Sequence, residues 1–161
     1  MKFEGVLPII TEGEKYRIKK YDNGHWLFPE QLGDGVGFIY VIRDNVLQRF
    51  YLGKKTFRGA GKLNYGKESN WKRYTSSSNT IATLLKERPV EEFDFIVLEQ
   101  YKAKGALSYA ETWTLCLVEA PTNVTWYNTR IEKVSWPVKE RITQRHKQRL
   151  HDVIAFHVFE E

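Results

Sequence analysis

The sequence is short of the residues that make covalent or metal cross-links. It holds one cysteine, Cys116, which excludes a disulfide within the chain and a zinc cluster built from thiolates. The four histidines are scattered along the chain and match no metal-site spacing. We therefore expect a reducing, cytoplasmic setting.

Long apolar runs are also missing. No run approaches the roughly 18 residues that a membrane helix needs, and the N-terminus, MKFEGVLPII, lacks the cleavage site of a secretory signal. We expect no membrane partner. The 161 residues suffice for one compact core, and nine Phe, nine Tyr and five Trp argue against disorder.

Positive charge is present and gathers in two stretches. Residues 53–73 hold seven cations against one acid, and residues 139–149 hold five against one. Aromatic residues interleave the first stretch, which is typical of a nucleic-acid-binding surface; a solvated charged face is the alternative for either stretch. The candidate contacts are Arg58, Lys62, Lys67, Arg73, Arg141 and Arg145.

The hydrophobic pattern predicts the order β-β-α-β-α-β-α. The predicted elements are strands at 37–43 and 46–52 with a turn at Asp44-Asn45, a helix at 77–87, a strand at 93–99, a helix at 106–119, an extended segment at 124–128 and a helix at 137–156. We expect an α/β or α+β fold, with a small, mostly antiparallel three-stranded sheet flanked by helices.

The same pattern suggests a division of the chain. Residues 1–34 form an N-terminal extension, because the Gly33-Asp34-Gly35 segment looks like a flexible joint. Residues 35–131 form the functional domain, and residues 132–161 form a basic C-terminal helix that packs on it.

The first hairpin carries two tyrosines whose positions follow from strand geometry. With a two-residue loop, Tyr40 opposes Arg49 and lies diagonal to Tyr51 on one face. The apolar residues Ile39, Val41, Phe50 and Leu52 occupy the other face. A four-residue loop preserves this parity. One face should therefore pack, while the other presents two phenols and a guanidinium, unless these are ordinary strand tyrosines.

Glu111 is the second unusual feature. In the helix at 106–119 it falls in the middle of an arc formed by Leu107, Leu115 and Val118. A carboxylate on an apolar face needs a charged or hydrogen-bonding partner. It is either one half of a structural salt bridge with a lysine or a ligand for Mg²⁺ or Mn²⁺.

The tripeptides FIY (38–40) and YLG (51–53), followed by Glu111 and by Asn128 in WYN, resemble the GIY-YIG nuclease family in order and approximate spacing. The resemblance covers roughly residues 36–131 and is strongest to phage-type members related to the Seg homing endonucleases. It implies a metal-dependent DNA endonuclease that leaves a 5′-phosphate and a 3′-hydroxyl. A phage-encoded enzyme of this kind would act in the cytoplasm of its bacterial host.

The resemblance also implies roles. Glu111 would bind Mg²⁺ or Mn²⁺, Tyr40 would act as general base or position the water, Tyr51 would orient water or phosphate, and Asn128 would hold the site in shape. Phosphate oxygens would be bound by Lys54, Lys55 and Lys72, with Arg49 beside the tyrosines.

One position departs from the family pattern. Aligned on Trp71 and Tyr74, the place of the family's arginine holds Asn70. The missing cation is then Lys72, which we place in the catalytic set, or Arg73, Lys55 or Arg58.

Two other functions stay open at this point. The chain is alternatively an inactive nucleic-acid-binding module on the same fold, or a phage protein that binds a host protein. Specificity would come from the loop at 58–70, the N-terminal segment, the last helix or a second subunit, so a homodimer stays open as well.

Overall fold

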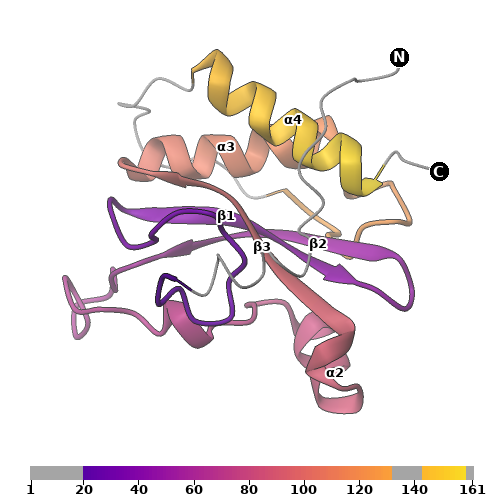
Figure 1. Cartoon of the computed structure of the whole chain (residues 1–161), viewed down its shortest axis with the longest axis horizontal. Helices are drawn as coiled ribbons and strands as arrows, with labels where there is room; N and C mark the ends of the chain where they lie inside the picture. Colours follow the sequence, from indigo (N-terminus) through magenta and orange to yellow (C-terminus); the bar gives the residue numbers. More distant parts are fainter. Residues whose placement is uncertain (1–19, 132–142, 159–161) are drawn as a thin grey trace.

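The computed structural model describes residues 20–131 and 143–158 (Figure 1). The described elements are β1 (Gly37–Asp44), β2 (Arg49–Thr56), the 3₁₀ turn η1 (Trp71–Arg73), α2 (Asn79–Glu87), the 3₁₀ turn η2 (Val90–Glu92), β3 (Phe93–Tyr101), α3 (Lys104–Leu117) and α4 (Gln144–Val158). None of the helices in this part of the chain combines the length and apolar character needed to cross a membrane.

The strands form one antiparallel sheet in the order β2-β1-β3. The predicted α+β fold, a small antiparallel sheet flanked by helices, is therefore confirmed. Two segments without strand geometry extend the sheet at its edges: Leu27 bridges to Ile96 beside β3, and Trp126 bridges to Phe50 beside β2.

The hairpin loop is longer than the predicted two residues. Asp44 pairs with Arg49, so residues 45–48 form a four-residue loop, and Tyr40 faces Gly53 instead of Arg49. The cause is the Asp44 carboxylate, whose Oδ1 accepts hydrogen bonds from the backbone N–H groups of Val46 and Leu47, each at 3.0 Å. The loop is longer by two residues, which is an even number, so each side chain stays on the face that was predicted for it.

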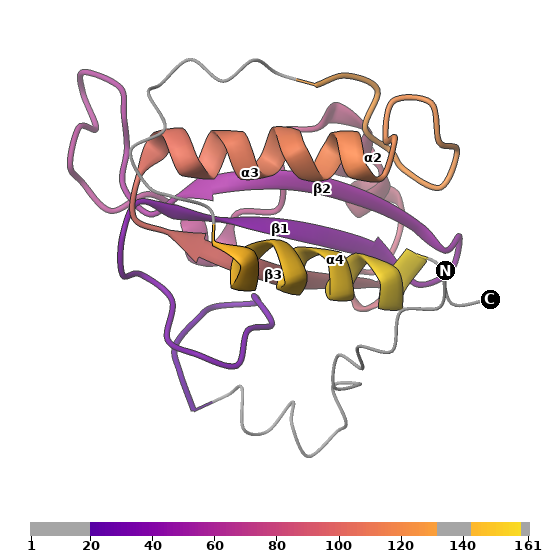
Figure 2. The same cartoon turned by 90° about the horizontal axis from the view of Figure 1, so that it is seen from above.

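One face of the sheet packs against α3 and α4, which lie side by side above it (Figures 1 and 2). Ile39, Val41, Phe50 and Leu52 all point into this layer, as the alternation predicts. From α4, Leu150, Val153 and Ile154 are buried in the same layer. The predicted C-terminal helix thus exists from Gln144 onward, while its predicted start at 137–142 lies outside the described residues.

The opposite face, which carries the tyrosines, is not open as the sequence suggested. The segment at 20–34, η1 and α2 cover it, and Tyr40 is only 1% exposed. The covering side chains are Trp26, Phe28, Leu32, Trp71 and Ile81. The sheet face that carries Tyr40 and Tyr51 is therefore reached by solvent only through a cavity at the edge of this layer.

The helix α2 begins and ends close to the prediction. The Ser78 hydroxyl accepts a hydrogen bond from the Ile81 N–H at 3.4 Å, which caps the first turn. Arg88 follows as an extended residue before Pro89 and ends the helix. Asn79 and Thr80 in the first turn of α2 are exposed.

Candidate active site

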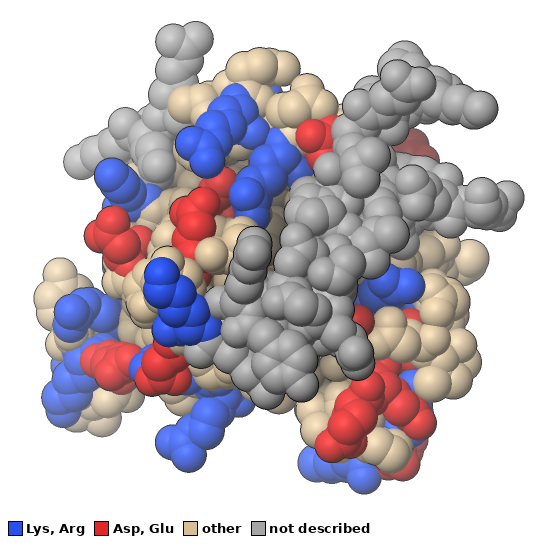
Figure 3. Space-filling model, viewed as in Figure 1, with Lys and Arg blue, Asp and Glu red and all other residues tan. Residues whose placement is uncertain are grey.

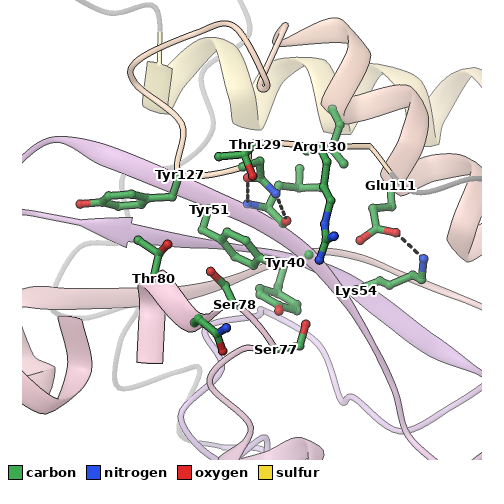
Figure 4. Close-up of a pocket in the computed structure, with 15 residues that line it drawn as sticks. Tyr40, Tyr51, Lys54, Ser77, Ser78, Thr80, Glu111, Tyr127, Thr129 and Arg130 are labelled. Carbon is green, nitrogen blue, oxygen red and sulfur yellow. Dashed lines mark hydrogen bonds and ion pairs between the residues drawn. The ribbon is translucent and has the colours of Figure 1, made fainter. Parts of the chain in front are cut away.

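A polar cavity of about 410 Å³ lies between β2, the first turn of α2, α3 and the segment that follows α3 (Figure 4). Four of the five predicted catalytic residues, Tyr40, Tyr51, Glu111 and Asn128, line it together. They come from β1, β2, α3 and the irregular segment at 118–131. Residues up to 88 positions apart in the sequence thus meet at one hollow.

The two tyrosines lie side by side on the floor of the cavity. Their ring centroids are 6.4 Å apart, and Tyr40 faces Gly53 across the strand pair. A Cβ atom at Gly53 would lie 2.5 Å from the Tyr40 hydroxyl oxygen. The glycine of the YLG tripeptide therefore makes room for the first phenol.

Both phenols are held in the protonated form. Burial raises the pKa of Tyr40 well above its ordinary value of 10.0, and the neighbouring phenols of Tyr74 and Tyr51 raise it further. Burial also raises the pKa of Tyr51, and the Glu111 carboxylate adds to this effect. In the chain without ligands, neither tyrosine is a base at neutral pH; each is a hydroxyl that donates or accepts hydrogen bonds.

Glu111 points from α3 into the cavity and forms an ion pair with Lys54 of β2 (Figure 4). Its side chain is 14% exposed, so the carboxylate lies at the boundary between the apolar layer under α3 and the hollow. From the sequence, Glu111 was either half of a structural salt bridge or a metal ligand, and the observed geometry is compatible with both roles. The ion pair supplies the charged partner that burial requires.

The surroundings of Glu111 suit an ion such as Mg²⁺ that is bound through a single protein carboxylate. Among the described residues, no three His, Cys, Asp or Glu side chains come together as a metal cluster. Mg²⁺ is often bound through one or two carboxylates, several waters and the phosphates of its substrate. A single carboxylate in an open polar cavity fits such an ion, and it does not fit a closed zinc site.

Asn128 is buried and fixes β2 from outside the sheet. Its Oδ1 accepts the Leu52 N–H at 2.9 Å, and its Nδ2 donates to the Leu52 carbonyl at 2.8 Å. Leu52 lies between Tyr51 and Gly53 in the YLG tripeptide. Asn128 therefore anchors the backbone at the centre of the second motif.

The cavity contains residues that the sequence did not single out. They are Ser77, Ser78, Asn79 and Thr80 at the start of α2, and Thr129 and Arg130 after Asn128. Arg130 reaches down into the hollow between the tyrosines and the Glu111–Lys54 pair (Figure 4). Its place two residues after Asn128 was the only available signal, because the segment is irregular and has no periodicity to show where a side chain points.

Lys72, the fifth predicted catalytic residue, is not among the residues that line the cavity. It pairs with Asp22 at 2.5 Å, and its Nζ lies 5.5 Å from the centre of the Trp71 ring. Lys55 lies closer to the family's arginine position, because its Nζ donates to Asn70 Oδ1 at 2.9 Å and lies over the Tyr74 ring. Burial lowers the pKa of Lys55.

The other predicted DNA contacts divide into two groups. Arg49 lies over the Tyr127 ring and donates to the carbonyls of Val124 and Trp126, so it supports the segment beside β2. Exposed positions are held by Arg58, Lys62, Lys67, Arg73 and Arg145. Arg141 lies outside the described residues.

The fold brings paired tyrosines, a carboxylate and cations together around one polar cavity. A family model for the SegE-type GIY-YIG endonuclease domain matches residues 20–131, and the chain belongs to this family. The matched region includes residues 20–34, whose side chains contribute to the core beneath Tyr40.

A similar relative is the intron-associated endonuclease 2 of Enterobacteria phage T4. It is 33% identical to this chain over 81 residues, which are 50% of this chain and 29% of the relative. The match therefore spans less than a third of the relative's own length. No solved structure matches the chain.

Proposed function

We propose that the chain is a divalent-metal-dependent DNA endonuclease, and that it hydrolyses a phosphodiester bond in the cavity around Glu111. The observation that carries the proposal is the meeting of Tyr40, Tyr51, Glu111 and Asn128 in one polar hollow beside Lys54 and Arg130. Family membership supports the reaction class. A phage relative supports action in an infected bacterial cytoplasm.

In this proposal Glu111 holds one Mg²⁺ or Mn²⁺ ion. Such an ion would supply charge neutralisation during phosphodiester hydrolysis. The Lys54 ammonium competes with the ion for the same carboxylate, and a DNA phosphate entering the cavity gives Lys54 another anionic partner. Binding of DNA and binding of the ion should therefore favour each other.

The remaining groups act on the phosphate and the water. Arg130 and Lys54 bind phosphate oxygens, and Tyr40 and Tyr51 hold the attacking water through their neutral hydroxyls. A bond forms between the water oxygen and phosphorus while the bond from phosphorus to the 3′ oxygen breaks. In the net reaction one proton of the water ends on the 3′ oxygen, and the remaining hydroxyl stays on phosphorus, which leaves a 5′-phosphate and a 3′-hydroxyl.

The test compares the wild-type chain with Glu111→Gln in nicking of supercoiled plasmid with Mg²⁺ or Mn²⁺. We expect Glu111→Gln to lower the rate at least about 100-fold, the scale on which loss of a group that stabilises the transition state acts. Glu99→Gln is a matched control, because Glu99 is 13% exposed and lies 3.9 Å from Arg149 beside α4, away from the cavity. Equal nicking by wild type and Glu111→Gln would remove Glu111 from the reaction.

A second function, a DNA-binding module without catalysis, is favoured by one observation. Asn70 stands at the position where the family carries its arginine. Tight, salt-dependent binding of DNA by wild type, together with no nicking of supercoiled, relaxed or branched DNA, would favour this module over the enzyme.

A further inference from the structure

A loop formed by residues 58–68 projects beyond the end of β2 (Figure 2). We call it the basic loop. Near its tip, Leu63 is 87% exposed and Tyr65 is 77% exposed. Single exposed apolar side chains are common on protein surfaces, but two of this size within three residues at the tip of one projection need a reason.

The basic loop is held by its own hydrogen bonds. The Arg58 guanidinium donates to the Gly66 carbonyl at 2.8 Å, and the Gly59 N–H donates to the Lys67 carbonyl at 2.9 Å. At the base, the Ser69 N–H donates to the Phe57 carbonyl at 2.8 Å. These bonds hold the backbone of the loop away from the core, and Leu63 and Tyr65 lie on its exposed side.

The charge around the tip favours one kind of partner. Arg58, Lys62 and Lys67 belong to the loop, and its one acid, Glu68, accepts a hydrogen bond from the Trp71 indole at 3.2 Å. At the lower left of Figure 3, where the loop projects, Lys and Arg side chains reach the outline of the molecule, with Asp or Glu side chains next to them. Apolar side chains framed by cations complement the grooves of DNA, where phosphates flank stacked bases.

We propose that the basic loop is a recognition element that inserts the Leu63 and Tyr65 side chains into a groove of the duplex DNA that is cleaved. Lys62 and Lys67 bind the flanking phosphates and hold the loop in the groove. Tyr65 stacks on a partly opened base step, and Leu63 wedges beside it. This inference rests on the proposed DNA-cleaving function and adds to it a means of choosing the site.

The reach of the chain limits where the contact falls. Lys54 lies in the cavity, and Leu63 follows it by nine residues. An extended chain spans about 3.3 Å per residue, so the tip lies within roughly 30 Å of the cavity. At about 3.4 Å per base pair this is no more than roughly nine base pairs from the cleaved bond.

The experiment uses the full chain with Glu111→Gln, on a 40-base-pair duplex that contains a cleavage site mapped with the wild-type chain. 2-Aminopurine is placed at successive positions, because its fluorescence rises when a base step opens. We expect a rise at one step within nine base pairs of the cleaved bond. Adding Leu63→Ala and Tyr65→Ala should remove the rise and weaken binding about tenfold.

Leu47→Ala with Val124→Ala is the matched control. These residues are 55% and 84% exposed and lie near the opposite end of β2, so this pair should behave like the parent chain. Lys62→Ala with Lys67→Ala should lower the slope of log affinity against log salt by about two. All four loop side chains are exposed, so thermal unfolding should not change.

The inference is overturned if the Leu63/Tyr65 variant binds the duplex and opens the base step as the parent chain does. It is also overturned if the fluorescence rise is absent from a chain that binds tightly. Failure of the proposed function gives a different result. The wild-type chain would then not nick plasmid under any condition, and the Glu99→Gln and Glu111→Gln variants would be equally inactive.

Discussion

The side-chain amide of Asn128 pairs with both backbone polar groups of Leu52, at 2.9 and 2.8 Å, as a neighbouring strand would. The pair is buried, and it joins the irregular segment after α3 to the centre of the YLG tripeptide. The alignment of Tyr51 and Lys54 over the cavity therefore depends on a residue that comes from outside the sheet.

Replacing Asn128 should damage stability and activity together. Asn128→Ala leaves the Leu52 N–H and carbonyl buried without partners, which costs roughly 2 to 4 kcal/mol of unfolding free energy. Asn128→Asp can accept from the N–H but cannot donate to the carbonyl, so we expect at least as large a loss. Chemical denaturation measures the first effect and plasmid nicking the second. A stable Asn128→Ala chain with full activity would contradict the positioning role.

Tyr40→Phe should lower nicking about 100-fold if the hydroxyl positions water or phosphate. Because burial raises the Tyr40 pKa well above 10.0, the phenol stays protonated across the neutral range. Between pH 7 and 9 the nicking rate should therefore depend on pH in the same way in wild type and in Tyr40→Phe. Tyr109→Phe, at an exposed position on α3, is the control. A Tyr40-dependent increase with pH would show that the phenolate is the base.

Arg130 should be the cation whose removal matters most. It lines the cavity with Glu111, whereas Lys72 pairs with Asp22 and does not line it. Arg130→Ala should lower the nicking rate by about 100-fold or more, since a cation on a transferring phosphoryl group stabilises the transition state. Lys86→Ala, a change at an exposed position in the last turn of α2, away from the cavity, should alter nicking only slightly. If Lys72→Ala abolishes nicking while Arg130→Ala does not, the sequence-based choice of cation holds.

Asp44→Asn should lower stability at neutral pH and flatten its dependence on acid. Asp44 is fully buried; burial by itself raises its pKa, but hydrogen bonds from Arg88, two backbone N–H groups and Tyr127 outweigh it and hold the pKa well below 3.8. A carboxyl with a lowered pKa stabilises the fold above about pH 3.8. That contribution is lost as the pH falls below this value.

The cost of Asp44→Asn at pH 7 should be on the order of 3 kcal/mol, because Arg88 loses a buried partner. Denaturation midpoints between pH 2 and 7 measure it, and the acid slope of the variant should be shallower than that of wild type. Asp34→Asn, at an exposed position, should follow the wild-type curve. An Asp44→Asn curve parallel to wild type would contradict the assignment.

The sequence was most informative where a strict period applies. The alternation of side chains along a strand assigned Tyr40 and Tyr51 to one face and Phe50 and Leu52 to the other, and an error in loop length did not change it. It could not show that the tyrosine face is covered, because the covering residues at 20–34 have no periodicity and reach the sheet through tertiary packing.

The same limit applies to the site. Glu111 was found because its position conflicts with the apolar face of its helix. Arg130 and the first turn of α2 conflict with nothing in their local sequence, and only the folded chain brings them to the cavity. The cations were the least predictable residues, because a lysine or arginine side chain is long enough to serve several partners from one backbone position.

Both outer strands of the sheet pair over part of their length with a segment that is not a strand. Leu27 exchanges hydrogen bonds with β3 on one edge, and residues 125–128 do so with β2 on the other. An open strand edge is a template on which a second chain can add a strand and begin aggregation. The residue that aligns the YLG tripeptide thus also blocks that template, so a chain without Asn128 should be prone to self-association as well as weakened in its fold.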